Sequence, residues 1–219
     1  MDKLQYSLFD MGVNKPECIK LPLENADVEY YPNFINESEP FFLELVNNLN
    51  WQQDKLKIVG KSIPIPRLNA WYGDAGAHYG YSGIRLNHND WCTILLTLKN
   101  RLLTELQLSF NSVLANYYRD GMDSMGWHSD NELELGEKPI IASLSFGDIR
   151  RFSFKLKKQS NGKPFSIDLE SGSLLLMKGD TQHFWLHQLP KVSNRTKACL
   201  KGRINLTFRT IVMNGHNAE

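Results

Sequence analysis

Two periods of hydrophobic residues divide the chain. Apolar side chains recur every three or four residues in SEPFFLELVNNL at 38–49 and in NDWCTILLTLKNRLLTEL at 89–106. Each segment predicts an amphipathic helix, with Ser38 and Asp90 as the expected N-terminal caps. From about residue 112 the period falls to two, in short β-prone runs separated by Gly, Asn and Asp turns: SVLANYYR, IIASLSF, RRFSFKL, FSIDL, SLLLMK, HFWLHQL and RINLTFRTI.

This pattern predicts a mainly β fold with flanking helices. The most economical arrangement is a jelly roll of seven or eight strands, a double-stranded β-helix, buttressed by the N-terminal helices. No repeat, low-complexity tract or linker divides residues 1–219, so we expect a single domain. Its parts are an N-terminal extension and helix at 1–50, a hairpin and loop region with a helix at 51–111, and the strand-rich core at 112–211.

The last β-prone run has two contrasting faces. Alternation places Ile204, Leu206 and Phe208 on one face and Arg203, Asn205, Thr207 and Arg209 on the other. The same alternation gives Leu114, Asn116 and Tyr118 a common face. A polar face of an antiparallel sheet ordinarily meets solvent, whereas arginines, amides and a phenol together would also suit a small dianion.

Composition limits the class of protein. With 42% hydrophobic and 11% aromatic residues in 219, the chain matches an ordinary soluble globule with one sizeable core. No apolar run approaches the roughly 20 residues of a membrane helix, and MDKLQYSLFD lacks the features of a signal peptide. We therefore expect no membrane partner and a location inside a cell, cytoplasmic in a bacterium and nuclear in a eukaryote. Cys18, Cys92 and Cys199 form no C-x-x-C pair and are expected to be free thiols.

Charge is unevenly distributed although the net charge is only +1. Residues 1–45 contain nine acidic and three basic side chains, which leaves 15 acidic and 22 basic in the rest. The basic side chains gather in three groups: Lys55, Lys57, Lys61 and Arg67; Arg150, Arg151, Lys155, Lys157, Lys158 and Lys163; Lys191, Arg195, Lys197 and Lys201. They predict either solvated faces and hairpin tips or a surface that follows a phosphate backbone.

The stretch GWHSDNE at 126–132 contains candidate metal ligands. If it is extended, His128 and Asp130 point to the same side and can reach one ion. Two histidines and one carboxylate are the ligand set of non-haem Fe(II) oxygenases. Among six histidines the third ligand is best sought in HFWLHQL, where His183 and His187 would share one face of a strand.

An ordered set of motifs resembles the AlkB family of Fe(II)- and 2-oxoglutarate-dependent nucleic-acid dealkylases. The motifs are N-x-Y from Asn116, H-x-D-x-E from His128, H-x-L-P from His187 and R-x-N-x-T-F-R from Arg203. S-L-S-F-G at 143–147 and P-R with Y-G-D-A-G within 66–76 extend the resemblance over roughly residues 55–211, closest to the branch that repairs duplex DNA. The resemblance implies a jelly-roll dioxygenase core that uses Fe(II), 2-oxoglutarate and O2, with His187 preferred to His183 because it precedes L-P.

The resemblance also implies roles for individual residues. His128, Asp130 and His187 would hold Fe(II), with Asn116 and Arg209 near the keto-acid end of 2-oxoglutarate. The far carboxylate would be held by Tyr118, Arg203 and Asn205. Substrate contacts would come from Tyr79, Tyr81, Ser82 and Glu132, and from a hairpin at 55–67 with Val59, Gly60, Lys61 and Arg67.

The activity that this resemblance implies is oxidative demethylation of DNA bases such as 1-methyladenine and 3-methylcytosine, with release of formaldehyde, succinate and CO2. Alternatives are a dioxygenase of the same fold that acts on RNA or protein, or a non-catalytic nucleic-acid-binding module. QYSLF at 5–9, from Gln5 to Phe9, resembles peptides that dock on the replication sliding clamp, although Tyr6 replaces the usual leucine. A monomer is expected.

Overall fold

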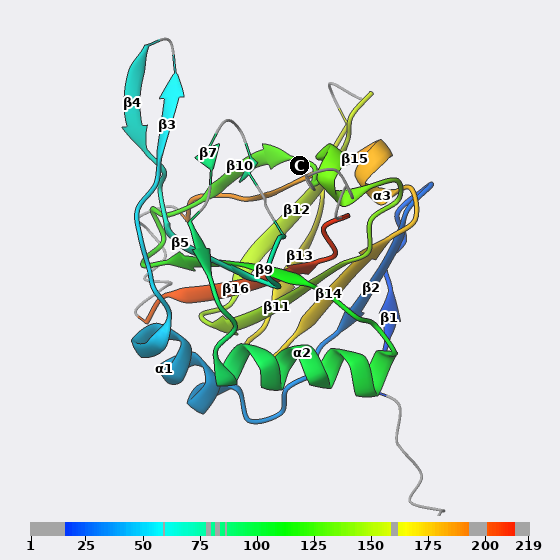
Figure 1. The fold of residues 1–219 in the computed structure, drawn as a ribbon. Coiled ribbons are helices and arrows are strands. Elements are labelled where there is room, and N and C mark those ends of the chain that lie inside the picture. Colours follow the sequence, from blue (N-terminus) through cyan, green and yellow to red (C-terminus); the bar gives the residue numbers. More distant parts are fainter. Residues whose placement is uncertain are drawn as a thin grey trace, which may run out of the picture.

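Two β-sheets lie face to face, and the helices cover the outer face of the larger sheet (Figure 1). The structure is a computed structural model that describes residues 16–58, 60–77, 80–81, 84–85, 87–158, 162–192 and 201–212. This layered arrangement of sheets with flanking helices confirms the mainly β fold and the jelly-roll core.

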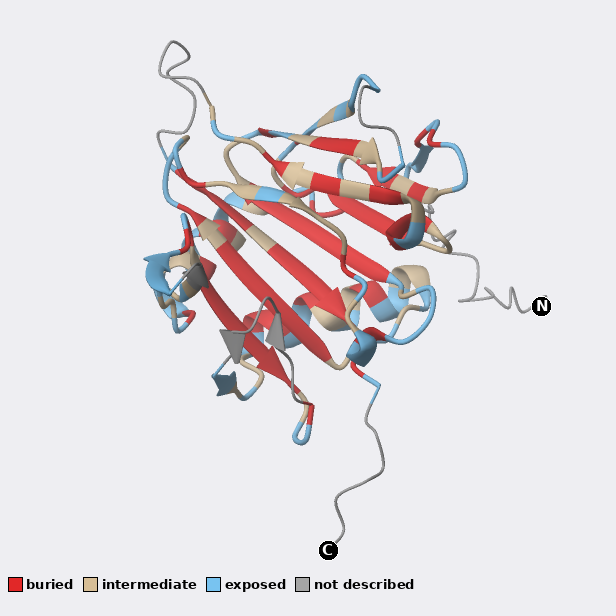
Figure 2. Ribbon diagram, turned by 90° about the horizontal axis from the view of Figure 1, so that it is seen from above, coloured by how far each residue is buried: buried red, intermediate tan, exposed pale blue. Residues whose placement is uncertain are grey.

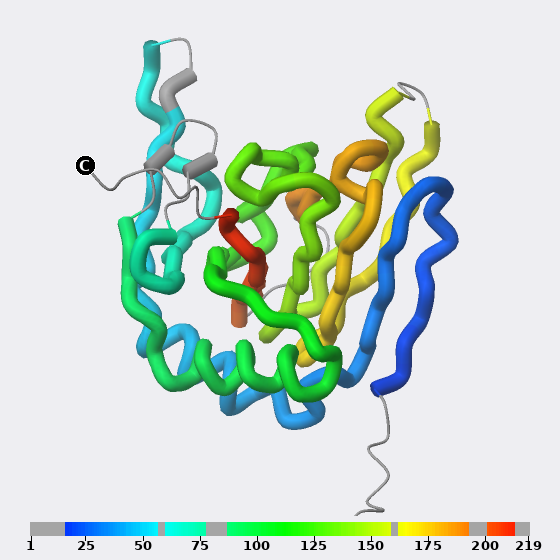
Figure 3. The backbone as a smooth tube through the Cα atoms, turned by 45° about the vertical axis from the view of Figure 1, so that its right-hand side comes forward, coloured from blue at the N-terminus to red at the C-terminus, as the bar shows by residue number. Residues whose placement is uncertain are grey.

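The larger sheet has eight strands among the described residues. In spatial order they are β1 (Ile19–Lys20), β2 (Asp27–Tyr31), β14 (Leu174–Lys178), β11 (Ile141–Gly147), β16 (Arg203–Arg209), β9 (Ser112–Tyr118), β5 (Leu68–Gly73) and β8 (His88–Asn89). Neighbouring strands are antiparallel except for β5 and β8. Strands far apart in sequence thus become neighbours, as Figure 3 shows for β2 in blue beside β14 in gold.

The smaller sheet has four strands, and two short hairpins lie outside both sheets. The order in the smaller sheet is β10 (Met125–His128), β15 (Trp185–Leu189), β12 (Arg150–Leu156) and β13 (Phe165–Leu169). The hairpins are β3 (Lys55–Ile58) with β4 (Lys61–Pro64), and β6 (Gly80–Tyr81) with β7 (Ile84–Arg85). The β3–β4 pairing confirms the hairpin predicted at 55–67, and this hairpin projects beyond the body of the protein (Figure 1).

The change of period at residue 112 had suggested that the strands of the core begin there. The sheets are not confined to residues 112–211. Strands β2, β5 and β8 precede that boundary and extend the larger sheet on both sides. They were missed because each is short and flanked by turns, so that periodicity alone does not distinguish them from loops. The division of roles among 1–50, 51–111 and 112–211 stays a prediction.

The two predicted helices are present, but each begins differently from the sequence expectation. Helix α1 (Ser38–Asn48) follows Glu37, so Ser38 is its first residue and not its cap, and the Ser38 hydroxyl contacts Ser171 Oγ at 2.7 Å. Helix α2 (Thr93–Leu106) follows Cys92, so it begins two residues after the start that the expected cap Asp90 implied. The helices are held by packing against the sheet, since neither has a side-chain cap bond.

Two layers of core separate the elements. One layer packs helices α1 and α2 against the larger sheet and includes Leu45, Leu98, Ile204, Leu206 and Phe208. The other lies between the two sheets and includes Val28, Phe154, Leu175 and Trp185. Figure 2 shows the buried residues along the central strands of the larger sheet. Ile204, Leu206 and Phe208 therefore face the helices, which leaves the polar face of β16 for the space between the sheets.

Among the described residues, no helix is long and apolar enough to cross a membrane. Cys18 and Cys92 are free thiols, as expected, whereas Cys199 lies outside the described residues.

Candidate active site

Three side chains that could hold a metal ion meet between the sheets. His128 ends strand β10 and pairs directly with His187 on β15, and Asp130 follows two residues later. One ligand atom from each lies within 4.8 Å of the others, and the two imidazole rings have centroids 4.2 Å apart. The donor set of two imidazoles and one carboxylate fits Fe(II) and leaves coordination positions for other ligands.

Each histidine is oriented by its surroundings. His128 Nδ1 lies 2.8 Å from the carbonyl oxygen of Gly126, which acts as an acceptor, so Nε2 is left to face the site. The ring of His187 stacks on Phe152 with centroids 5.4 Å apart. Burial, reinforced by the charge of His128, lowers the pKa of His187 to about 3. His187 is therefore neutral near pH 7 and can offer a lone pair to a metal.

Asp130 is a buried carboxylate held by a buried arginine. Arg209 Nη2 donates to Asp130 Oδ2 at 2.8 Å, and both residues are at most 5% exposed. Burial alone would raise the pKa of Asp130, but the charge of Arg209 and its hydrogen bond hold that pKa well below its usual range. The other oxygen, Oδ1, lies 3.7 Å from His128 Nε2. One oxygen of an ionised carboxylate therefore faces the histidines.

A polar pocket extends from these three residues between the sheets. Its walls come from β9, β16 and the facing strands, and its lining is Leu114, Asn116, Tyr118, Met125, His128, Asp130, Ser143, Phe152, Met177, His187, Leu189, Arg203, Asn205, Thr207 and Arg209. Both predicted alternations are confirmed, because the polar side chains of β9 and β16 face this pocket and not solvent. The pairing of Arg203 with Tyr118 and of Asn205 with Asn116 brings the two strands together in register.

Hydrogen bonds fix the polar side chains of the pocket. Arg203 Nη2 donates to Ser145 Oγ at 2.9 Å, and Asn205 Nδ2 donates to Ser143 Oγ at 2.7 Å. The guanidinium of Arg203 also lies 5.6 Å from the ring centroid of Tyr118. A buried arginine, an amide and a phenol in fixed positions could bind a small carboxylate.

A second cavity, of about 500 Å³, opens beside His128 and Asp130, two of the three candidate ligands. It shares Leu114, Met125, His128, Asp130 and Arg209 with the polar pocket, and its other lining residues are Leu56, Ile65, Pro66, Arg67, Gly126, Trp127, Ser129, Asn131 and Glu132. Glu132 lines this cavity together with Asp130, and its role as a substrate contact stays a prediction. His128 and Asp130 therefore lie at the boundary between the polar pocket and this wider opening, whereas His187 lines the polar pocket.

The predicted substrate contacts are only partly described. Gly60 and Lys61 are exposed on the β3–β4 hairpin, where Gly60 has a φ of +75° that suits a tight turn, but neither is among the residues that line the cavity. Val59, Tyr79 and Ser82 lie outside the described residues, and Tyr81 is described only by its backbone in β6.

Three sequence expectations for this region were wrong. His183 lies in the helical turn α3 (Thr181–Phe184) and is exposed, so it does not share a strand face with His187. Arg67 is only 3% exposed and Arg150 only 1%, so neither belongs to a basic surface. Sequence clustering misassigned them because a charge run does not show which side chain points inward.

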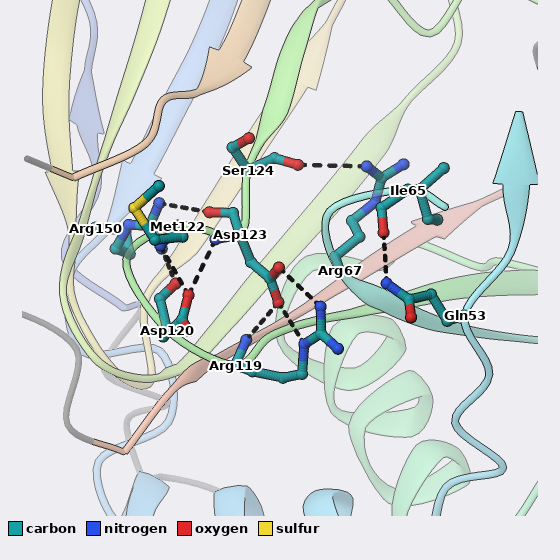
Figure 4. Close-up of polar contacts among 9 residues, drawn as sticks. All are labelled: Gln53, Ile65, Arg67, Arg119, Asp120, Met122, Asp123, Ser124 and Arg150. Carbon is teal, nitrogen blue, oxygen red and sulfur yellow. Dashed lines mark hydrogen bonds and ion pairs between the residues drawn. The ribbon is translucent and has the colours of Figure 1, made fainter. Parts of the chain in front are cut away.

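Arg67 and Arg150 instead donate hydrogen bonds to backbone carbonyl oxygens. Arg150 donates to the carbonyl oxygens of Asp120, Asp123 and Pro190 at 3.1, 3.0 and 2.7 Å, and Figure 4 shows it beside the loop at 120–124. Arg67 Nη1 donates to Ser124 O at 3.4 Å in the same view. Its Nε donates to Asn116 Oδ1 at 2.9 Å, which joins the base of the hairpin to the polar pocket.

Some residues near the site had no signal in the sequence. Gln182, in α3, accepts the backbone N–H of Asp130 at 2.9 Å, although it is 52 residues away. Phe152, Met125 and Trp127 line the two cavities without belonging to any motif. The serines at 143 and 145 had a weak signal, since they alternate with Leu144 and Phe146 along β11.

Known proteins similar to this chain agree with the geometry. A family model described as the 2OG-Fe(II) oxygenase superfamily matches residues 27–209. The Mus musculus alpha-ketoglutarate-dependent dioxygenase alkB homolog 3 is 40% identical over 191 residues, which cover 83% of this chain and 65% of that protein. The chain thus spans slightly less than two thirds of the length of this relative.

Two further matches extend the comparison. The Mus musculus DNA oxidative demethylase ALKBH2 is 37% identical over 210 residues, which cover 91% of this chain and 86% of that protein. The solved structure of OsALKBH1 shares the fold, with a TM-score of 0.57 and 16% identity over 89% of this chain and all of that one. From the family match and these relatives, the chain belongs to the 2OG-Fe(II) oxygenase superfamily and, within it, to the AlkB family.

Proposed function

We propose that this protein is an Fe(II)- and 2-oxoglutarate-dependent dioxygenase that demethylates alkylated bases in DNA. The observation that carries the proposal is the position of His128, Asp130 and His187, whose ligand atoms lie within 4.8 Å of one another in a polar pocket. His128 and Asp130 also line the adjoining cavity of about 500 Å³. The names of the relatives, alpha-ketoglutarate-dependent dioxygenase and DNA oxidative demethylase, support both halves of the proposal.

In this proposal His128 Nε2, Asp130 Oδ1 and a ring nitrogen of His187 bind Fe(II). The iron, when bound, supplies the oxidation by O2 that converts 2-oxoglutarate to succinate and CO2 and hydroxylates the methyl group, and the hydroxymethyl product then loses formaldehyde. The protein contributes the ligands, their orientation and an enclosed site. Arg209 keeps Asp130 ionised and directs one carboxylate oxygen toward the histidines.

The polar pocket would hold 2-oxoglutarate. Arg203 and Tyr118 lie opposite each other across the β16–β9 pair and would bind the far carboxylate together with Asn205. Asn116, fixed by Arg67, and Arg209 would lie near the keto-acid end. The hydrogen bonds to Ser145 and Ser143 hold Arg203 and Asn205 in place before the ligand arrives. These side chains therefore lose less conformational entropy when the ligand binds.

The wider cavity would receive the methylated base after it leaves the base stack. Glu132 is on its wall, and a carboxylate there favours a base made cationic by methylation, such as 1-methyladenine or 3-methylcytosine. Contacts with the base would be completed by Tyr79, Tyr81 and Ser82. The DNA next to the extruded base would be met by Val59, Gly60 and Lys61 of the predicted hairpin. Arg67 would act from the cavity wall rather than on a phosphate.

Product analysis tests the proposal directly. The purified protein with Fe(II), 2-oxoglutarate and O2 should form equal amounts of succinate and formaldehyde when a DNA oligonucleotide carries 1-methyladenine. His128→Ala should form neither, because it removes a ligand. Matched RNA carries the same lesion and shows whether DNA is preferred. Absence of formaldehyde from every methylated oligonucleotide, with iron bound, would reject demethylation.

We further propose that Gln5–Phe9, outside the described residues, docks on a replication sliding clamp. A peptide of residues 1–12 should bind a bacterial clamp, and the change of Leu8 and Phe9 to alanine should abolish binding; no binding at high micromolar peptide would reject this site. A monomer located in the bacterial cytoplasm or eukaryotic nucleus fits this role, and sedimentation of the purified chain tests the oligomeric state.

A further inference from the structure

We propose that Gln182 is a positioning residue that holds Asp130 in place for metal binding. This inference rests on the proposed metal site and adds a residue that belongs to no sequence motif. Gln182 is 3% exposed, as is Asp130, and its Oε1 accepts the backbone N–H of Asp130 at 2.9 Å. Because Gln182 does not reach the ligand atoms themselves, its effect would act through the position of Asp130.

Asp130 needs such a contact because it lies outside the strand ladder. Strand β10 ends at His128, and its last pairing with β15 is the pair His128 and His187. In the part of the chain that the structure describes, the backbone of Asp130 therefore has no cross-strand partner that fixes its position relative to the histidines. Gln182 supplies the acceptor that a neighbouring strand would otherwise provide.

A second contact completes the attachment. Arg209 Nη2 holds Asp130 Oδ2 at 2.8 Å, on the side-chain end of the residue. With the backbone held by Gln182 and one oxygen held by Arg209, rotation of the carboxylate is restricted. Oδ1 is then directed toward His128 Nε2, 3.7 Å away. Without Gln182 the arginine alone would allow the whole residue to shift with the loop.

Gln182 is itself rigidly placed. Its Nε2 donates to Met177 Sδ at 3.5 Å, which fixes the orientation of the amide and directs Oε1 toward Asp130. Lys157 Nζ donates to the carbonyl oxygen of Gln182 at 2.8 Å. The preceding Thr181 Oγ1 donates to Lys178 O at 2.6 Å. The short α3 turn is thereby anchored to β14 and to the residue that follows β12, so it can transmit a defined position to the loop.

Metal affinity distinguishes positioning from simple stabilisation. Groups that orient metal ligands typically contribute about 10–100-fold to metal affinity. We therefore expect Gln182→Leu, which removes the acceptor, to weaken Mn(II) binding to the metal-free protein by roughly that factor. Gln182→Glu keeps an acceptor oxygen at the same distance along the chain, although it loses the donor to Met177 Sδ, and should bind Mn(II) more tightly than Gln182→Leu.

Gln188→Leu is the matched control. Gln188 is half-buried on β15 next to His187, but it lies on the opposite strand face and does not line the pocket. Isothermal titration with Mn(II) should give this variant the affinity of the unchanged protein, and the melting temperature of each metal-free variant shows how much stability was lost. A purely structural role would lower the melting temperature of Gln182→Leu and leave the Mn(II) affinity of the folded protein unchanged.

The outcomes separate the two proposals. If the unchanged protein binds Mn(II), His128→Ala does not, and Gln182→Leu binds as tightly as the unchanged protein, the role of Gln182 is overturned while the metal site stands. If the unchanged protein binds no Mn(II), the proposed function fails and the role of Gln182 with it. Should Gln182→Leu not fold, Gln182→Asn withdraws the oxygen by one methylene, and an unchanged affinity in that variant overturns the inference equally.

Discussion

Replacement of Arg150 by methionine should destabilise the fold far more than the same change at Arg151. Arg150 is 1% exposed and donates to three backbone carbonyl oxygens, those of Asp120, Asp123 and Pro190. Hydrogen bonds with a charged partner contribute about 1.5–3 kcal/mol each, but methionine fills part of the space and the contributions overlap. We therefore expect a loss of about 3–5 kcal/mol in the free energy of unfolding.

Arg151 provides the matched comparison because it is the next residue on the same strand. Its side chain is 66% exposed, and Arg151 Nε lies 3.2 Å from Oδ1 of Asp168, whose side chain is 55% exposed. Such a pair contributes about 0–1 kcal/mol. Urea unfolding of Arg150→Met and Arg151→Met should show this difference in the free energy of unfolding. In thermal unfolding, the melting temperature of Arg150→Met should fall by roughly 6–20 °C, at about 2–4 °C per kcal/mol. Equal losses in the two variants would refute the assignment of Arg150 as a buried backbone clamp.

Three further changes test the site. As the pH falls below about 6.5, histidine in the unfolded chain binds a proton, whereas His187 in the folded protein stays neutral until about pH 3. The free energy of unfolding of the metal-free protein should therefore fall by up to about 1.4 kcal/mol for each pH unit of acidification between pH 6 and 4. If His187→Asn leaves this slope unchanged, the assignment is contradicted. Arg203→Lys should raise the KM for 2-oxoglutarate, measured from succinate, with little change in kcat, because a point charge replaces a fork; an unchanged KM argues against this role. Val59→Phe should raise initial rates on methylated duplex DNA more than on single strands, since a larger wedge covers more of the opened stack, and Val59→Ala should slow only the duplex; equal effects on both substrates would mean that no wedge operates.

Local patterns were enough to predict much of the fold. Alternation along β16 separated Ile204, Leu206 and Phe208 from the polar face, and both amphipathic helices pack as their apolar stripes predicted. These features are visible in sequence because each depends on side chains within one element. Strands β2, β5 and β8 were missed because their partners are distant in the chain, and short strands acquire stability only from that pairing.

The candidate ligands could be named from motifs, but the choice of histidine had no basis in periodicity. His183 and His187 are four residues apart, so on an ideal strand both would lie on the same face. Only the family resemblance favoured His187. The structure separates them physically, because the chain forms a helical turn at 181–184 before it enters β15. That turn is held by contacts with β2 and β14, through Thr181, which no local pattern reveals.

The mainly β class and the polar and apolar faces of β9 and β16 were predicted from the sequence alone, and its motifs suggested which side chains could bind a metal and a dianion. Which charges are buried depends on tertiary contacts: Arg150 and Arg151 are neighbours in one basic run, yet Arg150 is buried and Arg151 is exposed to solvent. Tertiary contacts also bring Gln182 to Asp130, 52 residues away in the sequence. Residue type and period act over a few neighbours, whereas burial and hydrogen-bond partners depend on which distant strands and turns close around a side chain.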